Sequence, residues 1–172
     1  SLNSIQGLIM EKDEDAALKY LNKFAKLMRL ILSNGEKSLI SLREEIDALK
    51  LYLELEALRW DNKFEYEITI DPKIDIDDYK IPTMLIQPYV ENAILHGVVP
   101  DVNKKGRIEI KMILSDNHII CKVNDNGIGI NRSKERSSIS ITPKHQSIGM
   151  KITGERLQAI NRLQQSKLSV NI

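Results

Sequence analysis

The feature that most constrains this chain is a change in the period of its apolar residues near Asp61 and Asn62. Before this point apolar residues recur every three or four positions, which is the spacing of an amphipathic helix. After it, residues 64–70 alternate between apolar and polar side chains, which is typical of a half-buried strand. The sequence therefore predicts helices in the first part of the chain and strands in the part that follows.

Two helices are predicted before the change of period, over residues 15–32 and from about residue 41 to residue 60. Ser41 and Glu44 have the spacing of a capping box at the start of the second helix. This second helix has two apolar stripes, so it must pack against more than one neighbour. We expect a helical hairpin that pairs with a hairpin of a partner chain or with the next domain. A helical subdomain that packs only within its own chain fits nearly as well.

Composition limits the classes of function. The chain has 172 residues, of which 42% are apolar and 28% charged, and its net charge of +1 argues against a general nucleic-acid surface. No apolar run approaches the roughly 20 residues of a membrane span, so we expect no membrane contact by this part. The chain opens at Ser1 inside a helical pattern, and we expect a fragment whose longer form could carry a membrane segment. The single cysteine, Cys121, lies in a strand-like run and is expected to be a buried structural thiol.

Residues 81–97, IPTMLIQPYVENAILHG, combine apolar and chemically useful side chains. The stretch is predicted to be largely helical, with Pro88 opening or kinking the helix. Asn92 and His96 are four apart and share one helix face. An amide oxygen at Asn92 can hold Mg²⁺ beside phosphates, and a carboxylate at Glu91 can orient or deprotonate a nucleophile. Taken alone, a solvated polar pair on a helix is the ordinary interpretation.

A second stretch, residues 125–130 (DNGIGI), follows the strand predicted over residues 119–123. Gly127 and Gly129 allow a backbone to approach a ligand closely and leave amide groups free. The Asp125 carboxylate is an acceptor suited to an exocyclic amine such as that of adenine. A hairpin turn is the alternative, because Asp-Asn-Gly is also turn chemistry.

Residues 131–146 lose all periodicity and are polar, basic and rich in serine. A linker and a mobile lid over a site are both open interpretations. The Ser147-Ile148-Gly149-Met150 run then opens a predicted helix, and its amides are placed to bind phosphate oxygens. Basic residues of the lid that could reach phosphates are Arg132, Lys134, Arg136 and Lys144. His145 as a phosphoacceptor is a weaker alternative.

The order E-N-x-x-x-H-G, D-N-G-x-G, polar lid and S-I-G-M resembles the ATP-binding domain of the GHKL superfamily, which includes gyrase-type ATPases and sensor histidine kinases. Residues 81–97, with YLELEALRW at 52–60, are similar to the LytS-type sensor histidine kinases, and the resemblance covers essentially the whole chain. It implies an α+β fold, a two-layer α/β sandwich of Bergerat (GHKL) type with a mixed sheet, preceded by an N-terminal helical hairpin. It divides the chain into a hairpin over 1–61, a remnant of the dimerisation and phosphotransfer part, and a catalytic domain over 62–172, expected to be truncated at its C-terminus.

The resemblance also implies roles for individual residues. Glu91 would be the polarising carboxylate, and Asn92 would be both a catalytic residue and the ligand of a Mg²⁺ ion that bridges the phosphates. ATP and Mg²⁺ are the implied cofactors. The residues implied to bind ATP are Asn92, His96, Gly97, Asp125, Gly127, Gly129, Ser147, Gly149 and Met150.

The implied activity is transfer of the ATP γ-phosphoryl group to a histidine and from there to a response regulator. In the resembled family the acceptor lies in an N-P-H-F-x-F-N motif, which these residues lack, so the fragment is expected to bind ATP but not to phosphorylate itself. The resemblance further implies a homodimer through the hairpin and the cytoplasmic portion of a bacterial sensor anchored in the inner membrane. The alternatives are a GHKL ATPase with a hydrolysis-driven dimer clamp and a non-enzymatic dimerisation module whose glycines are only turns.

Overall fold

The computed structural model describes residues 14–101, 103–116 and 118–129 of the chain. The predicted lid, the predicted helix behind it, and the candidate residues Ser147, Gly149 and Met150 lie outside these described residues. The elements are, in chain order, α2 (Glu14–Gly35), β1 (Leu39–Ser41), α3 (Leu42–Arg59), β2 (Phe64–Ile70), β3 (Lys80–Pro82), α4 (Gln87–Asn92), the π-helix η1 (Ala93–Val98), β4 (Gly106–Ser115) and β5 (His118–Asp125).

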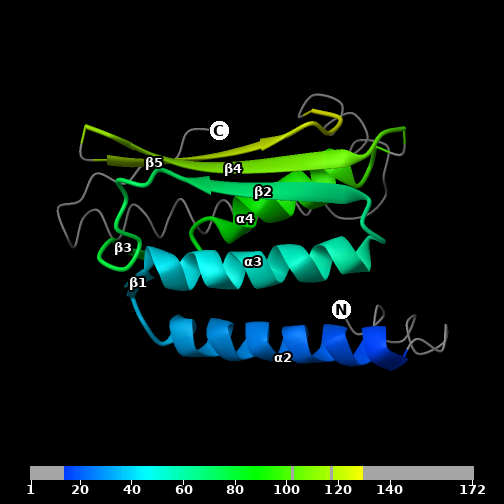
Figure 1. Ribbon diagram of the computed structural model, residues 1–172, viewed down its shortest axis with the longest axis horizontal. Helices are drawn as coiled ribbons and strands as arrows, with labels where there is room; N and C mark the ends of the chain where they lie inside the picture. The colour runs from blue at the N-terminus through cyan, green and yellow to red at the C-terminus, as the bar shows by residue number, and fades with distance from the viewer. Residues whose placement is uncertain (1–13, 102, 117, 130–172) are drawn as a thin grey trace, which may run out of the picture.

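Within the part of the chain that the structure describes, the main sheet has three strands in the order β2-β4-β5 (Figure 1). β2 runs parallel to β4, with Phe64 opposite Gly106, whereas β4 and β5 are antiparallel and join through a tight turn in which Asp116 has a φ of 46°. The predicted strand over residues 64–70 is confirmed. A separate antiparallel pair, β1 with β3, places Ile40 opposite Ile81.

The helices form layers on one side of this sheet (Figure 1). α3 and α4 lie next to the sheet, and α2 lies beyond α3, farthest from the strands. The structure is therefore α+β, with a mixed sheet and N-terminal helices, as expected. No helix among the described residues combines the length and apolar character needed to cross a membrane.

α3 has two apolar sides, and each has a partner in the same chain. One side joins the main core between helices and sheet, where Leu53, Val90 and Ile94 pack with Ile108 and Ile110 of β4. All five side chains are fully buried. The other side faces α2 in a smaller cluster. That cluster consists of Tyr20, Leu27, Ala48 and Leu55. Burial on both sides explains why the sequence of α3 is apolar on two stripes rather than one.

The helical prediction for residues 81–97 is wrong at its start. Ile81 and Pro82 belong to β3, and the helix begins only at Gln87. Of the two roles predicted for Pro88, opening the helix is the one observed: it lies in the first turn, where a backbone N–H would have no intrahelical acceptor. Pairing of β3 with β1 satisfies the backbone of residues 80–82 and decides this boundary.

The prediction that Cys121 is buried is also wrong, since the residue is exposed on β5. It lies opposite the buried Met112 in the strand register. Among the described residues, β5 is an outer strand that pairs on one side only, with β4.

The predicted capping box at the start of α3 is confirmed. The Ser41 Oγ accepts a hydrogen bond from the Glu44 N–H at 3.2 Å, and the Glu44 carboxylate accepts one from the Ser41 N–H at 2.8 Å. Lys37 Nζ also donates to this carboxylate at 2.7 Å. The Lys37 hydrogen bond, followed by the Ser41 amide, lowers the pKa of Glu44 to about 2.

We expect Glu44→Gln to lower the free energy of unfolding at pH 7 by about 1 kcal/mol, because the side chain is 36% exposed and its ion pair is screened by solvent. A carboxylate whose pKa is lowered in the folded state stabilises the fold above its unfolded value of 4.5 and stops doing so as the pH falls to about 2. Urea unfolding of wild type and variant should therefore differ at pH 7 and converge near pH 2. Glu36→Gln, an exposed change just after α2, is the control and should match wild type at both pH values.

Candidate functional site

The helix formed by α4 and η1 carries the first group of candidate residues. Val90, Ala93 and Ile94 are buried and fix the helix against the sheet, which leaves Glu91 exposed and Asn92 half-buried. The Asn92 Nδ2 donates a hydrogen bond to the Pro88 carbonyl at 2.8 Å. This bond fixes the orientation of the amide and commits its nitrogen to the helix, so Oδ1 is the atom with which Asn92 can bind a cation.

The second half of this helix has the wider turn of a π-helix, with the Val99 N–H bonded to the Ile94 carbonyl five residues earlier at 3.0 Å. In a regular α-helix, residues five apart point about 140° away from one another. The wider turn brings Asn92 and Gly97 more nearly into line along the helix. Such π-helical segments are rare and are frequently found at functional sites.

The end of β5 carries the second group. Asn126 extends the pairing with β4 past the last strand residue: its N–H donates to the Arg107 carbonyl at 3.1 Å, and its Oδ1 accepts from the Arg107 N–H at 2.7 Å. Its Nδ2 donates to the Lys105 carbonyl at 3.3 Å. The Asp125 Oδ1 accepts from the Gly127 N–H at 2.9 Å, which shapes the loop and leaves the second carboxylate oxygen to receive a donor.

The helix end and the strand end meet at two glycines. A Cβ on Gly97 would lie 2.6 Å from the Asp125 Oδ1, so the carboxylate occupies the space that a side chain would fill. A Cβ on Gly127 would lie 2.1 Å from the Gly97 carbonyl carbon. The Ile128 N–H donates to the Gly97 carbonyl at 3.2 Å. Backbone and carboxylate therefore come into direct contact only because both positions lack a side chain.

The structure thus brings Gly97, Asp125 and Gly127 together, while Glu91, Asn92 and His96 lie on the same continuous helix as Gly97. His96 is exposed next to the contact. Gly129, with a φ of 79°, has open space around its Cβ position. The sequence patterns assigned Asn126 no role of its own, whereas the structure shows that it joins the end of β5 to Arg107 and Lys105.

The candidate residues offer single oxygen donors and no cluster of metal ligands. Within residues 14–101, 103–116 and 118–129, no three His, Cys, Asp or Glu side chains gather to hold an ion. Mg²⁺ is often held by one or two protein oxygens together with phosphate oxygens and water. The Asn92 Oδ1 is an oxygen of the kind that such an ion uses together with the phosphates of a nucleotide.

Glu91 also has acidic and aromatic neighbours on α3. Burial, followed by the negative charges of Glu56 and Glu91, raises the pKa of Tyr52. Glu56 is itself buried and accepts a hydrogen bond from the Trp60 Nε1 at 3.1 Å. The YLELEALRW stretch thus lies within electrostatic range of the candidate carboxylate, which its linear separation from Glu91 does not reveal.

Comparison with known proteins gives consistent matches. Residues 1–64 match the family model described as histidine kinase. The chain is 35% identical to the uncharacterized protein YwpD of Bacillus subtilis over 161 residues, which are 91% of this chain and 55% of that protein. It is 28% identical to the sensor protein LytS of Staphylococcus epidermidis over 94% of the chain and 26% of LytS. It is 30% identical to the sensor histidine kinase YpdA of Escherichia coli over 76% of the chain and 22% of YpdA.

The class follows from these matches: the chain is homologous to sensor histidine kinases. The matches to LytS sensor proteins confirm the LytS-type resemblance that the motifs at residues 52–60 and 81–97 predicted. The chain spans about half the length of YwpD and about a quarter of the LytS protein it matches.

Proposed function

We propose that this chain is the ATP-binding catalytic part of a two-component sensor histidine kinase, which transfers the γ-phosphoryl group of ATP to a histidine and from there to a response regulator. The observation that carries the proposal is the contact of Gly97 with Asp125 and Gly127. It joins a helix that bears an amide oxygen to a strand end that bears a carboxylate and a glycine-hinged loop. A carboxylate can accept a hydrogen bond from the amine of a purine base. An amide oxygen can hold the metal ion that accompanies the phosphates at the other end of the nucleotide.

Each candidate residue has a chemical task in this proposal. Asp125 accepts a hydrogen bond from the adenine amine, and Gly127 and Gly129 let the backbone approach the base. Asn92 holds Mg²⁺, which neutralises phosphate charge when bound, and Glu91 polarises the attacking group. His96 and Gly97 line the phosphate side, and residues Ser147, Gly149 and Met150 contribute amides to the phosphates. Phosphoryl transfer depends mainly on such positioning and charge neutralisation.

The finer description of the fold belongs to the same proposal. A mixed sheet with helices on one side supports a Bergerat (GHKL) sandwich over residues 62–172 that follows a helical hairpin over residues 1–61. α3 packs against both α2 and the sheet, so the two parts share a helix layer. We place this part of the sensor in the cytoplasm, where ATP is available.

Isothermal titration calorimetry with a non-hydrolysable ATP analogue tests the proposal. We expect binding in the presence of Mg²⁺ and a large loss of affinity in EDTA. Steady ATP turnover by the chain would favour the alternative, a GHKL ATPase with a dimer clamp, because a kinase without its acceptor hydrolyses ATP very slowly. A silent titration at millimolar nucleotide would contradict both and favour a non-enzymatic module.

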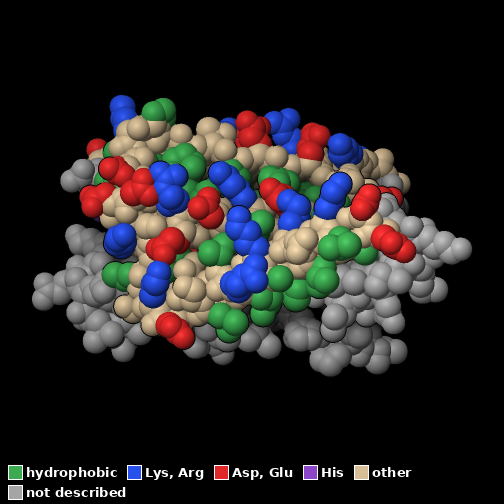
Figure 2. Space-filling view, turned by 60° about the horizontal axis from the view of Figure 1, so that its bottom comes forward, with side chains coloured by type: hydrophobic (Ala, Val, Ile, Leu, Met, Phe, Trp, Pro, Cys, Tyr) green, Lys and Arg blue, Asp and Glu red, His purple; other side chains and the backbone are tan. Residues whose placement is uncertain are grey.

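An exposed row on α2 supports a homodimer. Leu18, Leu21, Met28 and Leu32 are 58%, 48%, 38% and 66% exposed, and with Ala25 they are spaced alternately three and four apart. This heptad spacing is that of a coiled-coil seam. Figure 2 shows hydrophobic side chains gathered in a band along the lower part of the face on which α2 comes forward. A second copy of the chain with the same seam is the partner that such a pattern fits.

We expect Leu21→Glu to weaken this dimer, because the variant places a charge at the middle of an apolar seam. Light scattering coupled to size exclusion should show a mass near twice 19.7 kDa for the wild type and near 19.7 kDa for the variant. Lys26→Glu adds an acid to the same helix outside the seam and should remain dimeric. A monomeric wild type at high micromolar concentration would contradict the proposed partner.

A further inference from the structure

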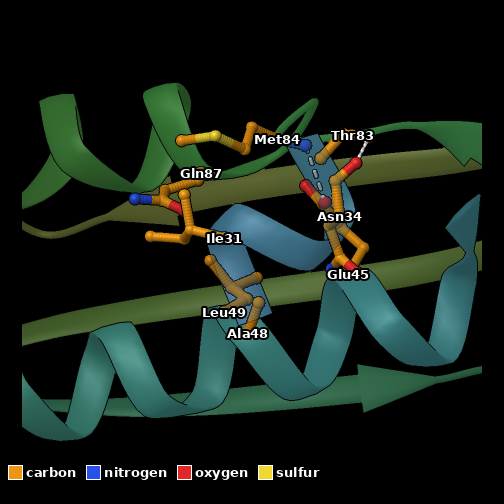
Figure 3. A pocket seen from close by; sticks show the side chains of 8 residues that line it. All are labelled: Ile31, Asn34, Glu45, Ala48, Leu49, Thr83, Met84 and Gln87. Carbon is orange, nitrogen blue, oxygen red and sulfur yellow. Dashed lines mark hydrogen bonds between the residues drawn. The ribbon is translucent and has the colours of Figure 1, made fainter. Parts of the chain in front are cut away.

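A buried carboxylate joins α3 to the segment that precedes α4. Glu45 is 3% exposed, and its two oxygens accept hydrogen bonds from the Met84 N–H at 2.9 Å and the Ile86 N–H at 3.0 Å. Figure 3 shows this carboxylate beneath the segment at residues 83–87, beside a small cavity of about 10 Å³ that has room for roughly one water molecule.

The two amides that Glu45 binds belong to the turn that starts the candidate nucleotide helix. Ile86 immediately precedes α4, and its apolar side chain makes no capping hydrogen bond. Met84 has a φ of 55°, a conformation that a non-glycine residue adopts only when its surroundings hold it there. A carboxylate from another helix therefore supplies the acceptors that this turn needs. Burial of a carboxylate is costly unless it is hydrogen-bonded in this way.

A second connection lies next to the first. The Thr83 Oγ1 is 3.1 Å from both the Asn34 carbonyl, at the end of α2, and the Lys37 carbonyl, in the connection to α3. The β1–β3 pair continues the same junction, with Leu39 opposite Pro82. Residues 80–86 are thus attached to the end of α2, to the α2–α3 connection and to the first turns of α3.

We propose that Glu45 is a positioning residue that fixes the start of α4, and with it Glu91 and Asn92, to the helical hairpin of α2 and α3. The inference rests on the proposed nucleotide site and adds to it a mechanical connection. α4 continues directly into η1, so a displacement at Ile86 moves Asn92, six residues along the same helix, relative to Asp125 at the end of β5. A change in hairpin packing then reaches the metal-binding amide without any contact between hairpin and nucleotide.

The test compares Glu45→Gln with Asp47→Asn, an exposed carboxylate two residues further along α3. A glutamine keeps the size of the side chain but offers only one acceptor oxygen to two N–H donors. Amide hydrogen exchange should lose protection at Met84 and Ile86 by about tenfold or more. Affinity for the Mg²⁺-bound ATP analogue should fall between about tenfold and a hundredfold. Asp47→Asn should change neither quantity.

Thr83→Val and Thr83→Ser provide a second pair in case Glu45→Gln does not fold. Serine keeps the hydroxyl and should retain wild-type affinity, whereas valine should weaken binding. Wild-type affinity in a folded Glu45→Gln variant, or unchanged protection at Met84 and Ile86, would overturn the role of Glu45 while the wild-type protein still binds nucleotide. Absence of binding by the wild type itself would overturn the proposed function, and the connection to it as well.

Discussion

Replacement of Asn92 by alanine should lower the affinity for a Mg²⁺-bound ATP analogue by about a hundredfold or more. The Nδ2 of this residue is committed to the Pro88 carbonyl at 2.8 Å, so the amide presents its oxygen in a fixed direction. Alanine removes that oxygen and leaves the apolar anchors Val90 and Ile94 in place. Calorimetry in Mg²⁺ and in EDTA measures the effect, and the variant should be nearly insensitive to EDTA.

Asn22→Ala is the matched control, because Asn22 is exposed on α2, in the layer farthest from the sheet. Its affinity should equal that of the wild type. Circular dichroism and urea unfolding should show that the Asn92→Ala variant is folded. A folded Asn92→Ala variant that binds the Mg²⁺-bound analogue like wild type would exclude Asn92 as the metal ligand.

Replacement of Gly127 by alanine should destabilise the protein by about 3 kcal/mol and abolish nucleotide binding. The new Cβ would lie 2.1 Å from the carbonyl carbon and 2.2 Å from the carbonyl oxygen of Gly97, and both atoms belong to the backbone of a packed helix. Neither can rotate away, so the loop after Asp125 or the end of η1 must move. Urea unfolding gives the change in stability, and titration with the analogue gives the change in affinity.

Two other glycines separate this effect from a general cost of alanine. At Gly97 the nearest atom is the Asp125 Oδ1 at 2.6 Å, and a carboxylate can rotate, so Gly97→Ala should reduce affinity more than stability. At Gly35 a Cβ would meet nothing within 4 Å, so Gly35→Ala should stay within about 1 kcal/mol of wild type. Equal stability of the Gly127→Ala and Gly35→Ala variants would show that the contact at Gly97 is absent in solution.

Local patterns were enough to predict much of the fold. Alternation between residues 64 and 70 predicted β2, and the Ser41–Glu44 spacing predicted the start of α3 together with its capping box. Both predictions depend only on residues close together in the sequence. A strand repeats every two residues, and a capping box joins residues three apart, so no distant contact was needed.

Predictions failed where a distant partner decides the outcome. Ile81 and Pro82 pair with β1 instead of entering a helix, and Cys121 is exposed on β5, which pairs only with β4 among the described strands. The acceptor for the turn before α4 is Glu45, about forty positions earlier. Helical spacing around Glu45 shows only that the residue lies on α3, because nothing in its neighbourhood tells which amides it will meet.

The sequence alone predicted the residues to which we assign the chemistry: the Glu91 carboxylate, the Asn92 amide, the Asp125 carboxylate and the glycines around them. It also predicted the similarity to LytS-type sensor histidine kinases, because the order of motifs can be read directly along the sequence. Only the tertiary structure decided that Gly97 and Gly127 are in contact and that Glu45 holds the start of α4. Close approach between distant segments depends on the packing of the whole core, and no local period encodes it.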